Sequence, residues 1–266
     1  MKFIQVTIFV FIYIAIGFLF KLDGNQYLLI GVPLALIFQV FIRKKSIKSA
    51  WLRTDEKIEF NFKSILYVVL FSVYPIYKIY KICIQDELNI TSILYNFCII
   101  LGAFGLSYAV SNLTKKTAKE TLLCLLTSGI LGVLISFGGT YVKSCMNSTA
   151  INFNFESFFT SILMYVPIVF VLEEVVFRGI LDEHISENDK KINYWSILYI
   201  CFLWGWWHLP ITNKGFEEFI GASIVLPIIH TIAGFFMSVY WRKSGNLIAP
   251  GFTHAFIDAI RNALLK

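Results

Sequence analysis

Two adjacent glutamates, Glu173 and Glu174, stand in an otherwise apolar run, and Arg178 follows four residues after the second. On a helix, Glu174 and Arg178 lie on one face and can form an ion pair, which lowers the cost of burying both charges. Glu173 then lies about 100° around the helix and keeps a carboxylate without a partner. Such a carboxylate can act as a general base for water. The competing interpretation is a salt bridge at a helix end near a membrane surface.

A histidine follows a tryptophan-rich segment, in which Trp204, Trp206 and Trp207 precede His208 and Pro210. An imidazole can hydrogen-bond a water, transfer a proton near neutral pH or bind a metal. Tryptophans are also common where helices meet a membrane surface, so these aromatic residues alone imply no chemistry. We treat His208 as a candidate catalytic residue.

A third polar pair, His254 and Asp258, stands four residues apart in the last apolar run and points at one cavity. Asp258 could orient His254, bind a metal beside it, or satisfy its ring nitrogen. His230 has no polar partner at helical spacing and predicts a buried core histidine. His184 lies in the polar segment 182–191 and predicts a solvated surface group.

Helix geometry allows these motifs to meet. If the chain reverses near Lys190, Glu173 lies 17 residues before the turn and His208 lies 18 after it, so the two reach similar depth. If the chain reverses again near Ser244, His254 lies ten residues after that turn, which is about 15 Å along the helix. His254 then reaches the depth of Glu173 and His208 only if the hairpin that turns near Lys190 projects further from the membrane than the one that turns near Ser244.

The composition places these motifs in a membrane. The 266 residues are 57% hydrophobic and only 15% charged, with a mean hydropathy of +0.70, which excludes a soluble enzyme. Long continuous apolar runs predict an all-α polytopic bundle of about eight or nine spans, with seven as the lower bound. The runs are 3–20, 27–42, 65–84, 93–113, 121–142, 158–180, 194–209, 219–241 and 247–265.

The basic residues predict the orientation of this bundle. With nine spans, 16 of the 23 Lys and Arg residues fall on the side of the N-terminus and 7 on the other, so the positive-inside rule puts the N-terminus in the cytoplasm. The net charge of +6 is then explained by topology, and we expect no nucleic-acid partner. We expect the first run to be a retained helix rather than a signal peptide. The five cysteines are scattered and predict small buried hydrophobes.

The three motifs resemble the signature of the CAAX protease and bacteriocin-processing family, also called CPBP or Abi, which includes type II CAAX prenyl endopeptidases. The pattern is Glu-Glu-x-x-x-Arg at 173–178, aromatic-x-x-x-His at 204–208 and His-x-x-x-Asp at 254–258, within a segment of about 158–265. Residues 1–150 resemble the family only in spanning a membrane. We therefore divide one membrane domain into N-terminal helices, 1–150, and a catalytic core, 151–266.

The resemblance implies a role for each motif residue. Glu173 would activate the attacking water with His208. Glu174 and Arg178 would hold the site together, and His254 with Asp258 would stabilise the oxyanion. The sequence departs from the family pattern in having Trp204 where Phe is usual. It also has an aspartate where the family often has Asn, and because an ionised aspartate cannot donate, His254 would have to be the donor.

The favoured function is an intramembrane endopeptidase that needs no cofactor and cleaves near the cytoplasmic surface of a bacterial plasma membrane. Its expected partners are the lipid bilayer and a membrane-associated or lipidated peptide of the CAAX type or the bacteriocin and pheromone type. A zinc-dependent version would use Glu173, His208 and His254 as ligands. Two other classes stay open: a non-catalytic immunity or scaffold protein, and an ion-coupled transporter, although the polar residues are confined to one half of the chain.

Overall fold

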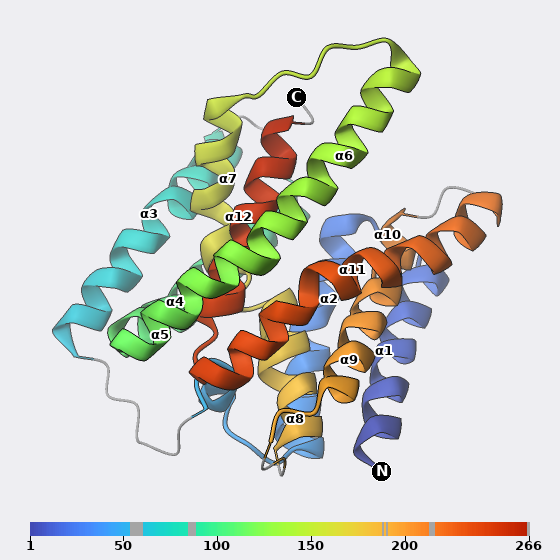
Figure 1. The fold of residues 1–266 in the computed structure, drawn as a ribbon. Helices are drawn as coiled ribbons and strands as arrows, with labels where there is room; N and C mark the ends of the chain where they lie inside the picture. Colours follow the sequence, from blue (N-terminus) through green and yellow to red (C-terminus); the bar gives the residue numbers. More distant parts are fainter. Residues whose placement is uncertain (54–60, 85–88, 188, 190, 213–215, 265–266) are drawn as a thin grey trace.

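The structure is a computed structural model that describes residues 1–53, 61–84, 89–187, 189, 191–212 and 216–264. It is helical, and the described residues contain no strand, only one isolated bridge between Leu52 and Asn246. The predicted all-α bundle is confirmed (Figure 1). The elements are α1 (Lys2–Leu19), α2 (Gly24–Ile37), η1 (Phe38–Ile42), η2 (Ile47–Ala50), α3 (Phe62–Ile84), α4 (Ile90–Ser111), α5 (Lys115–Cys124), η3 (Leu125–Gly129), α6 (Ile130–Asn147), α7 (Phe155–Ile168), η4 (Val175–Asp182), α8 (Glu183–Ser186), α9 (Tyr194–Trp207), α10 (Leu209–Thr212), α11 (Phe216–Ser244) and α12 (Ile248–Leu264).

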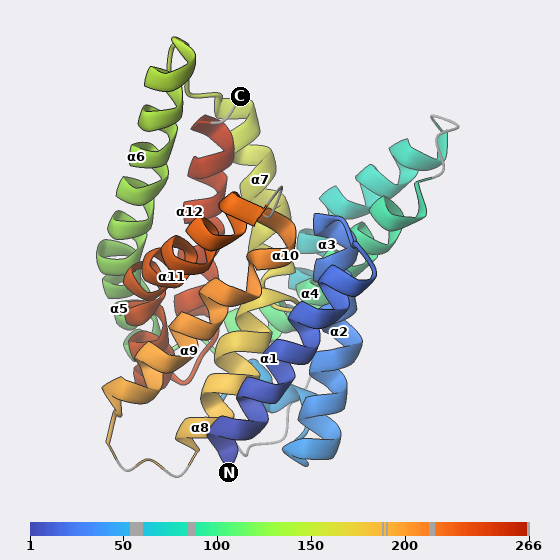
Figure 2. The ribbon, with the colours of Figure 1, turned by 90° about the vertical axis from the view of Figure 1, so that its right-hand side faces the viewer.

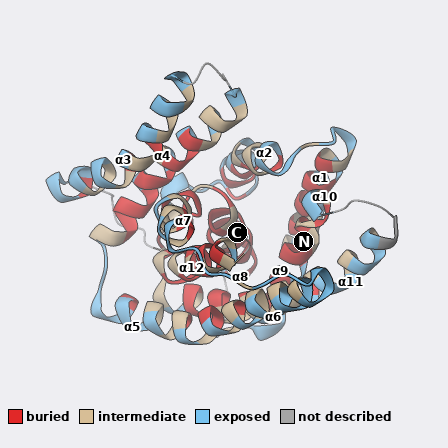
Figure 3. Cartoon of the chain, turned by 90° about the horizontal axis from the view of Figure 1, so that it is seen from above, coloured by how far each residue is buried: buried red, intermediate tan, exposed pale blue. Residues whose placement is uncertain are grey.

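Lipid must cover the outer faces of these helices. Large apolar side chains such as Leu70 on α3 and Leu134 on α6 are exposed on the outside, while the interior is buried (Figure 3). Within the described residues, six segments are long and apolar enough to cross a membrane: 2–19, 24–42, 62–84, 90–111, 115–147 and 218–244. The other three predicted runs form helices shorter than 18 residues, namely α7, α9 and α12. The protein is a multi-pass membrane protein.

Polar caps begin several helices. Asp23 and Gln26 form a reciprocal capping box at the start of α2, and the side chains of Asn89, Asn154 and Asn193 accept from the first turns of α4, α7 and α9. These caps satisfy backbone N–H groups that the helix itself leaves unpaired. They explain why long apolar runs are cut into separate helices at these points.

The sixth apolar run is broken, and the break forms the site. We expected one continuous span over 158–180, but α7 ends at Ile168, one residue after Pro167, which has no N–H for the helical ladder. Four residues of turn follow, and the helix resumes at Glu173 before widening into the π-helix η4. The π-helical turn is rare and is frequent at functional sites. The break places both glutamates at the start of a new helix inside the bundle.

Helices distant in sequence pack around this break. α7 packs against α4 and α12, and α9 packs against α11 (Figure 2). The close fit of α4 on α7 depends on Gly102, because a Cβ there would lie 2.0 Å from the Pro167 carbonyl oxygen. The N- and C-termini lie at opposite ends (Figure 1). α8 projects beyond the α11–α12 connection, as the depth comparison required (Figures 1 and 2).

Candidate active site

The base of the site is a fully buried ion pair. Arg178 Nη1 donates to Glu174 Oε1 at 2.9 Å, and both side chains are 0% exposed. The predicted pairing of Glu174 with Arg178 is therefore present. The guanidinium also lies over the Trp204 ring, with its Cζ atom 4.1 Å from the ring centroid. These contacts tie η4 to α9 below the cavity.

Glu174 also accepts a hydrogen bond from His254. The His254 Nδ1 atom lies 2.8 Å from Glu174 Oε1, the same oxygen that accepts from Arg178. A carboxylate can only accept, so Nδ1 carries a proton and Nε2 faces the cavity. The sequence offered Asp258 as the orienting group, but Asp258 Oδ2 instead lies 3.5 Å from Nε2. Asp258 also pairs with Arg261 at 3.1 Å.

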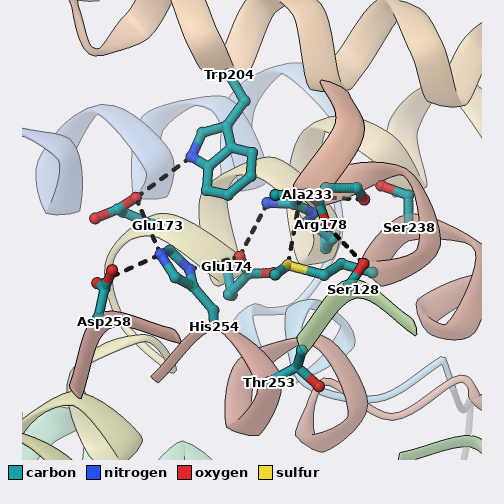
Figure 4. A network of polar contacts seen from close by, with 12 residues as sticks. Ser128, Glu173, Glu174, Arg178, Trp204, Ala233, Ser238, Thr253, His254 and Asp258 are labelled. Atoms are coloured by element: carbon teal, nitrogen blue, oxygen red, sulfur yellow. Dashed lines mark hydrogen bonds and ion pairs between the residues drawn. The ribbon is translucent and has the colours of Figure 1, made fainter. Parts of the chain in front are cut away.

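Glu173 faces away from the ion pair and lies between two imidazoles. Its Oε2 atom lies 3.6 Å from His208 Nε2 and 3.8 Å from His254 Nε2, and it accepts from Trp204 Nε1 at 3.3 Å. Figure 4 shows His254 between the carboxylates of Glu173 and Asp258, with the Trp204 indole on the other side of Glu173. Glu173 is 17% exposed, which leaves its carboxylate accessible from the cavity.

A local hydrogen bond fixes the ring of His208. Its Nδ1 atom lies 2.9 Å from the Trp204 carbonyl oxygen one turn back, so the proton sits on Nδ1 and the lone pair of the neutral ring sits on Nε2, toward Glu173. Trp207, which packs edge-on against the His208 ring, buries the other side. The tryptophan-rich segment therefore positions the histidine.

His230 is a satisfied histidine, as predicted, but it also lines the cavity beside His208, which the sequence did not indicate. Its ring centroid lies 4.0 Å from that of His208, its Nδ1 bonds the Leu226 carbonyl at 2.8 Å, and it lines the cavity. The available signal was Gly234, one turn further along α11. A Cβ at Gly234 would lie 2.6 Å from Arg178 Nη2, so the glycine marks the helix face that packs on the site.

His184 also departs from the prediction. It is 6% exposed rather than solvated, and its Nε2 lies 2.9 Å from Gln5 Oε1 at the far end of the bundle from the cavity. Burial lowers its pKa from 6.5 to about 4, with further lowering from the charges of Lys2 and Arg43. The short helix α8, which carries His184, packs against α1, and its last three residues are buried.

A cavity of about 540 Å³ joins the motif residues. Glu173, His208, His254 and Asp258 line it, and isoleucines such as Ile229 supply apolar walls. Glu174 and Arg178 lie behind this lining. The three motifs, which are scattered over 173–258, thus form one site with four groups facing the cavity and two supporting them.

The residues named for a zinc ion, Glu173, His208 and His254, lie together at the cavity. The Nε2 atoms of His208 and His254 lie 3.6 and 3.8 Å from Glu173 Oε2. Among the described part of the chain, no group of three or more His, Cys, Asp or Glu side chains is placed so that it could hold a metal ion.

The fold and site define a multi-pass helical membrane protein with a buried glutamate and histidine centre. Residues 155–260 match the family model described as type II CAAX prenyl endopeptidase Rce1-like. This match confirms the resemblance to the CAAX protease family and indicates an intramembrane protease of the CAAX type in general. No curated protein and no solved structure matches the chain.

Proposed function

We propose that the protein is an intramembrane endopeptidase in which Glu173 and His208 activate water to attack a peptide bond. The observation that carries this proposal is the separation of 3.6 Å between Glu173 Oε2 and His208 Nε2 at the wall of a cavity inside the bundle. The match to the Rce1-like family supports peptide hydrolysis as the reaction.

The two groups suit a bridging water. Both the Glu173 carboxylate and the neutral His208 Nε2 are acceptors, and 3.6 Å is too long for a direct hydrogen bond. A water between them would donate one hydrogen to each and present its oxygen lone pair to the substrate. Trp204 Nε1, which donates to Glu173, would hold the carboxylate in place while it takes the proton.

The reaction would then proceed in two stages. The water oxygen bonds to the scissile carbonyl carbon as one proton moves to Glu173, and His254, when doubly protonated, donates from Nε2 to the oxyanion. The C–N bond then breaks as the proton passes to the leaving amine, which gives one carboxyl and one amine product. The motifs place no Ser or Cys beside a base, so no acyl-enzyme is proposed.

The substrate we propose is a membrane-associated or lipidated peptide of the CAAX type or the bacteriocin and pheromone type. Apolar side chains in the cavity wall, among them Ile135, Ile229 and Ile257, suit such a peptide. The proposed enzyme needs no cofactor, and its proposed location is a bacterial plasma membrane with a cytoplasmic N-terminus.

The test is cleavage of a peptide library by the purified protein in liposomes. Glu173→Gln and His208→Ala should each lower kcat by about 10²- to 10⁴-fold, the usual contribution of general acid and base catalysis. Glu156→Gln, which alters an exposed carboxylate in the first turn of α7, is the matched control and should retain full activity.

A zinc chelator separates the two chemical versions. Activity that persists in chelator and is lost in both site variants supports the glutamate mechanism. Activity that is lost in chelator and returns with zinc would assign the same residues to a metal. Absence of cleavage in every sample, together with a Glu173→Gln protein that still functions in cells, would refute the enzyme and favour a scaffold.

A further inference from the structure

Three cavities formed by described residues meet at one end of the bundle. Two further cavities of about 490 and 370 Å³ adjoin the catalytic one, and all three share Asn25, the second residue of α2. The catalytic cavity reaches Thr212 at the end of α10 and Arg261 in the last turn of α12. These positions lie toward the end at which the C-terminus is marked (Figure 1).

The opposite end is closed below the site. The segment 43–53 crosses it, with Trp51 Nε1 donating to the Phe170 carbonyl at 2.8 Å and Arg43 Nη1 donating to the Gly179 carbonyl at 3.1 Å. Arg43 is 8% exposed, and Gly179 is packed so closely that a Cβ would lie 2.1 Å from the Ala50 carbonyl oxygen. No direct path for a peptide is left between this segment and η4.

A second closure lies beside the first. Arg242, near the end of α11, forms an ion pair with the fully buried Asp182 and donates to the Ser196 hydroxyl at 2.9 Å. Asn246 donates to the Ala109 carbonyl at 2.9 Å and joins the α11–α12 turn to α4. These polar groups are satisfied by one another, so this end is a packed wall.

The closed end carries most of the basic residues. Clusters at 43–48, 115–119 and 242–243 lie there, whereas the described cations of the open end, such as Lys21, Lys78 and Lys143, are more widely spread. Lys and Arg collect on the cytoplasmic side of membrane proteins. The closed end is thus the cytoplasmic end by charge, and the cavity opens away from it.

We infer that the active site is served from the non-cytoplasmic side of the membrane. The substrate is then a peptide segment that has been translocated or that is anchored in the outer leaflet, rather than a cytoplasmic tail as the sequence alone suggested. This inference rests on the proposed function for the reaction, and of the two substrate classes proposed there it selects the bacteriocin and pheromone type over the CAAX type. The side from which the site is reached is argued from the packed residues at the closed end, the position of the cavity mouth and the distribution of basic residues, none of which depends on activity.

Thiol labelling in intact cells tests the sidedness. Cys98, Cys124 and Cys201 are buried, whereas Cys83 and Cys145 are exposed near the open end. Replacing the two exposed cysteines by Ser gives a protein without accessible native thiols, into which one reporter cysteine at a time can be introduced. Asn25→Cys reports the cavity mouth, and Lys116→Cys, on exposed α5, reports the closed end.

A membrane-impermeant maleimide should label Asn25→Cys as fully in intact bacterial cells as in permeabilised ones. Lys116→Cys should react only after permeabilisation. The native Cys145 in a Cys83→Ser protein is a second reporter for the open end, and it decides the result if Asn25→Cys is unreactive in both samples. The reverse pattern, or labelling of both ends in intact cells, overturns the inference. Cleavage by the purified protein is measured separately, so failure of the sidedness leaves the proposed function standing.

Discussion

Replacing Arg178 by Met should destabilise the protein strongly. Both Arg178 and Glu174 are 0% exposed, and removing one partner of such a pair leaves a buried charge without compensation, which costs about 3–5 kcal/mol. Contact of the guanidinium with Trp204 at 4.1 Å adds to the loss, although the two terms overlap. Thermal unfolding in detergent can be followed with a thiol-reactive dye in proteins whose exposed Cys83 and Cys145 are replaced by Ser, because the fully buried Cys124 and Cys201 then react only when the chain opens.

The double variant Arg178→Met with Glu174→Met decides whether uncompensated charge is the cause. It removes both charges and leaves the His254 Nδ1 without its acceptor, at a cost of about 1–3 kcal/mol. We therefore expect the double variant to be more stable than Arg178→Met and still inactive. If it is equally or less stable, the reasoning from buried charge is wrong. Lys2→Met is the control, because the Lys2–Glu187 pair is about 30% exposed at each side chain and should contribute less than about 1 kcal/mol.

Two further predictions concern single contacts. Trp204→Phe keeps an aromatic ring, as in the family pattern, and removes the N–H that donates to Glu173, so kcat should fall by about tenfold. The smaller ring also fills less of a buried position against Arg178, so the variant should be less stable and its kcat is measured below its unfolding temperature. Trp206→Phe, which loses a similar bond to the Ser223 carbonyl, should leave kcat unchanged, and equal rates for the two variants would contradict this. Burial lowers the pKa of His184 to about 4, so between this value and 6.5 the unfolded chain binds a proton that the folded protein does not. Lowering the pH from 7.5 to 5 should then destabilise the protein by about 1–2 kcal/mol, and His184→Gln should lose that part of the pH dependence in thermal unfolding. An unchanged pH dependence in the variant would show that His184 is not the group responsible.

The sequence predicts the helical bundle and the residues of the site because both depend on local patterns. Apolar runs of membrane length need no tertiary information, and the spacing of four between Glu174 and Arg178 fixes their pairing on any regular helical turn. Counting residues from one turn, expected near Lys190, also predicts that Glu173 and His208 reach similar depth, which the structure confirms.

The features that sequence reasoning missed depend on contacts between distant segments. Nothing local to His254 indicates that Glu174, 80 residues earlier, rather than Asp258 holds its Nδ1. His230 has no polar neighbour at helical spacing, and only the packing of α11 on α9 brings its ring to His208. The break after Pro167 was missed although the proline was a local signal, because prolines also occur inside continuous membrane helices, as Pro75 does in α3 and Pro227 in α11.

The shared oxygen of Glu174 has a consequence for biosynthesis. Its partners come from different stages of synthesis, since Arg178 lies on the same element and His254 arrives on α12, 80 residues later. Until the ribosome has made α12 and that helix has inserted, the glutamate pair has no histidine to orient, and the cavity lacks one wall. In the proposed mechanism, a nascent chain that already contains Glu173 and His208 would therefore not hydrolyse neighbouring peptides during its own insertion.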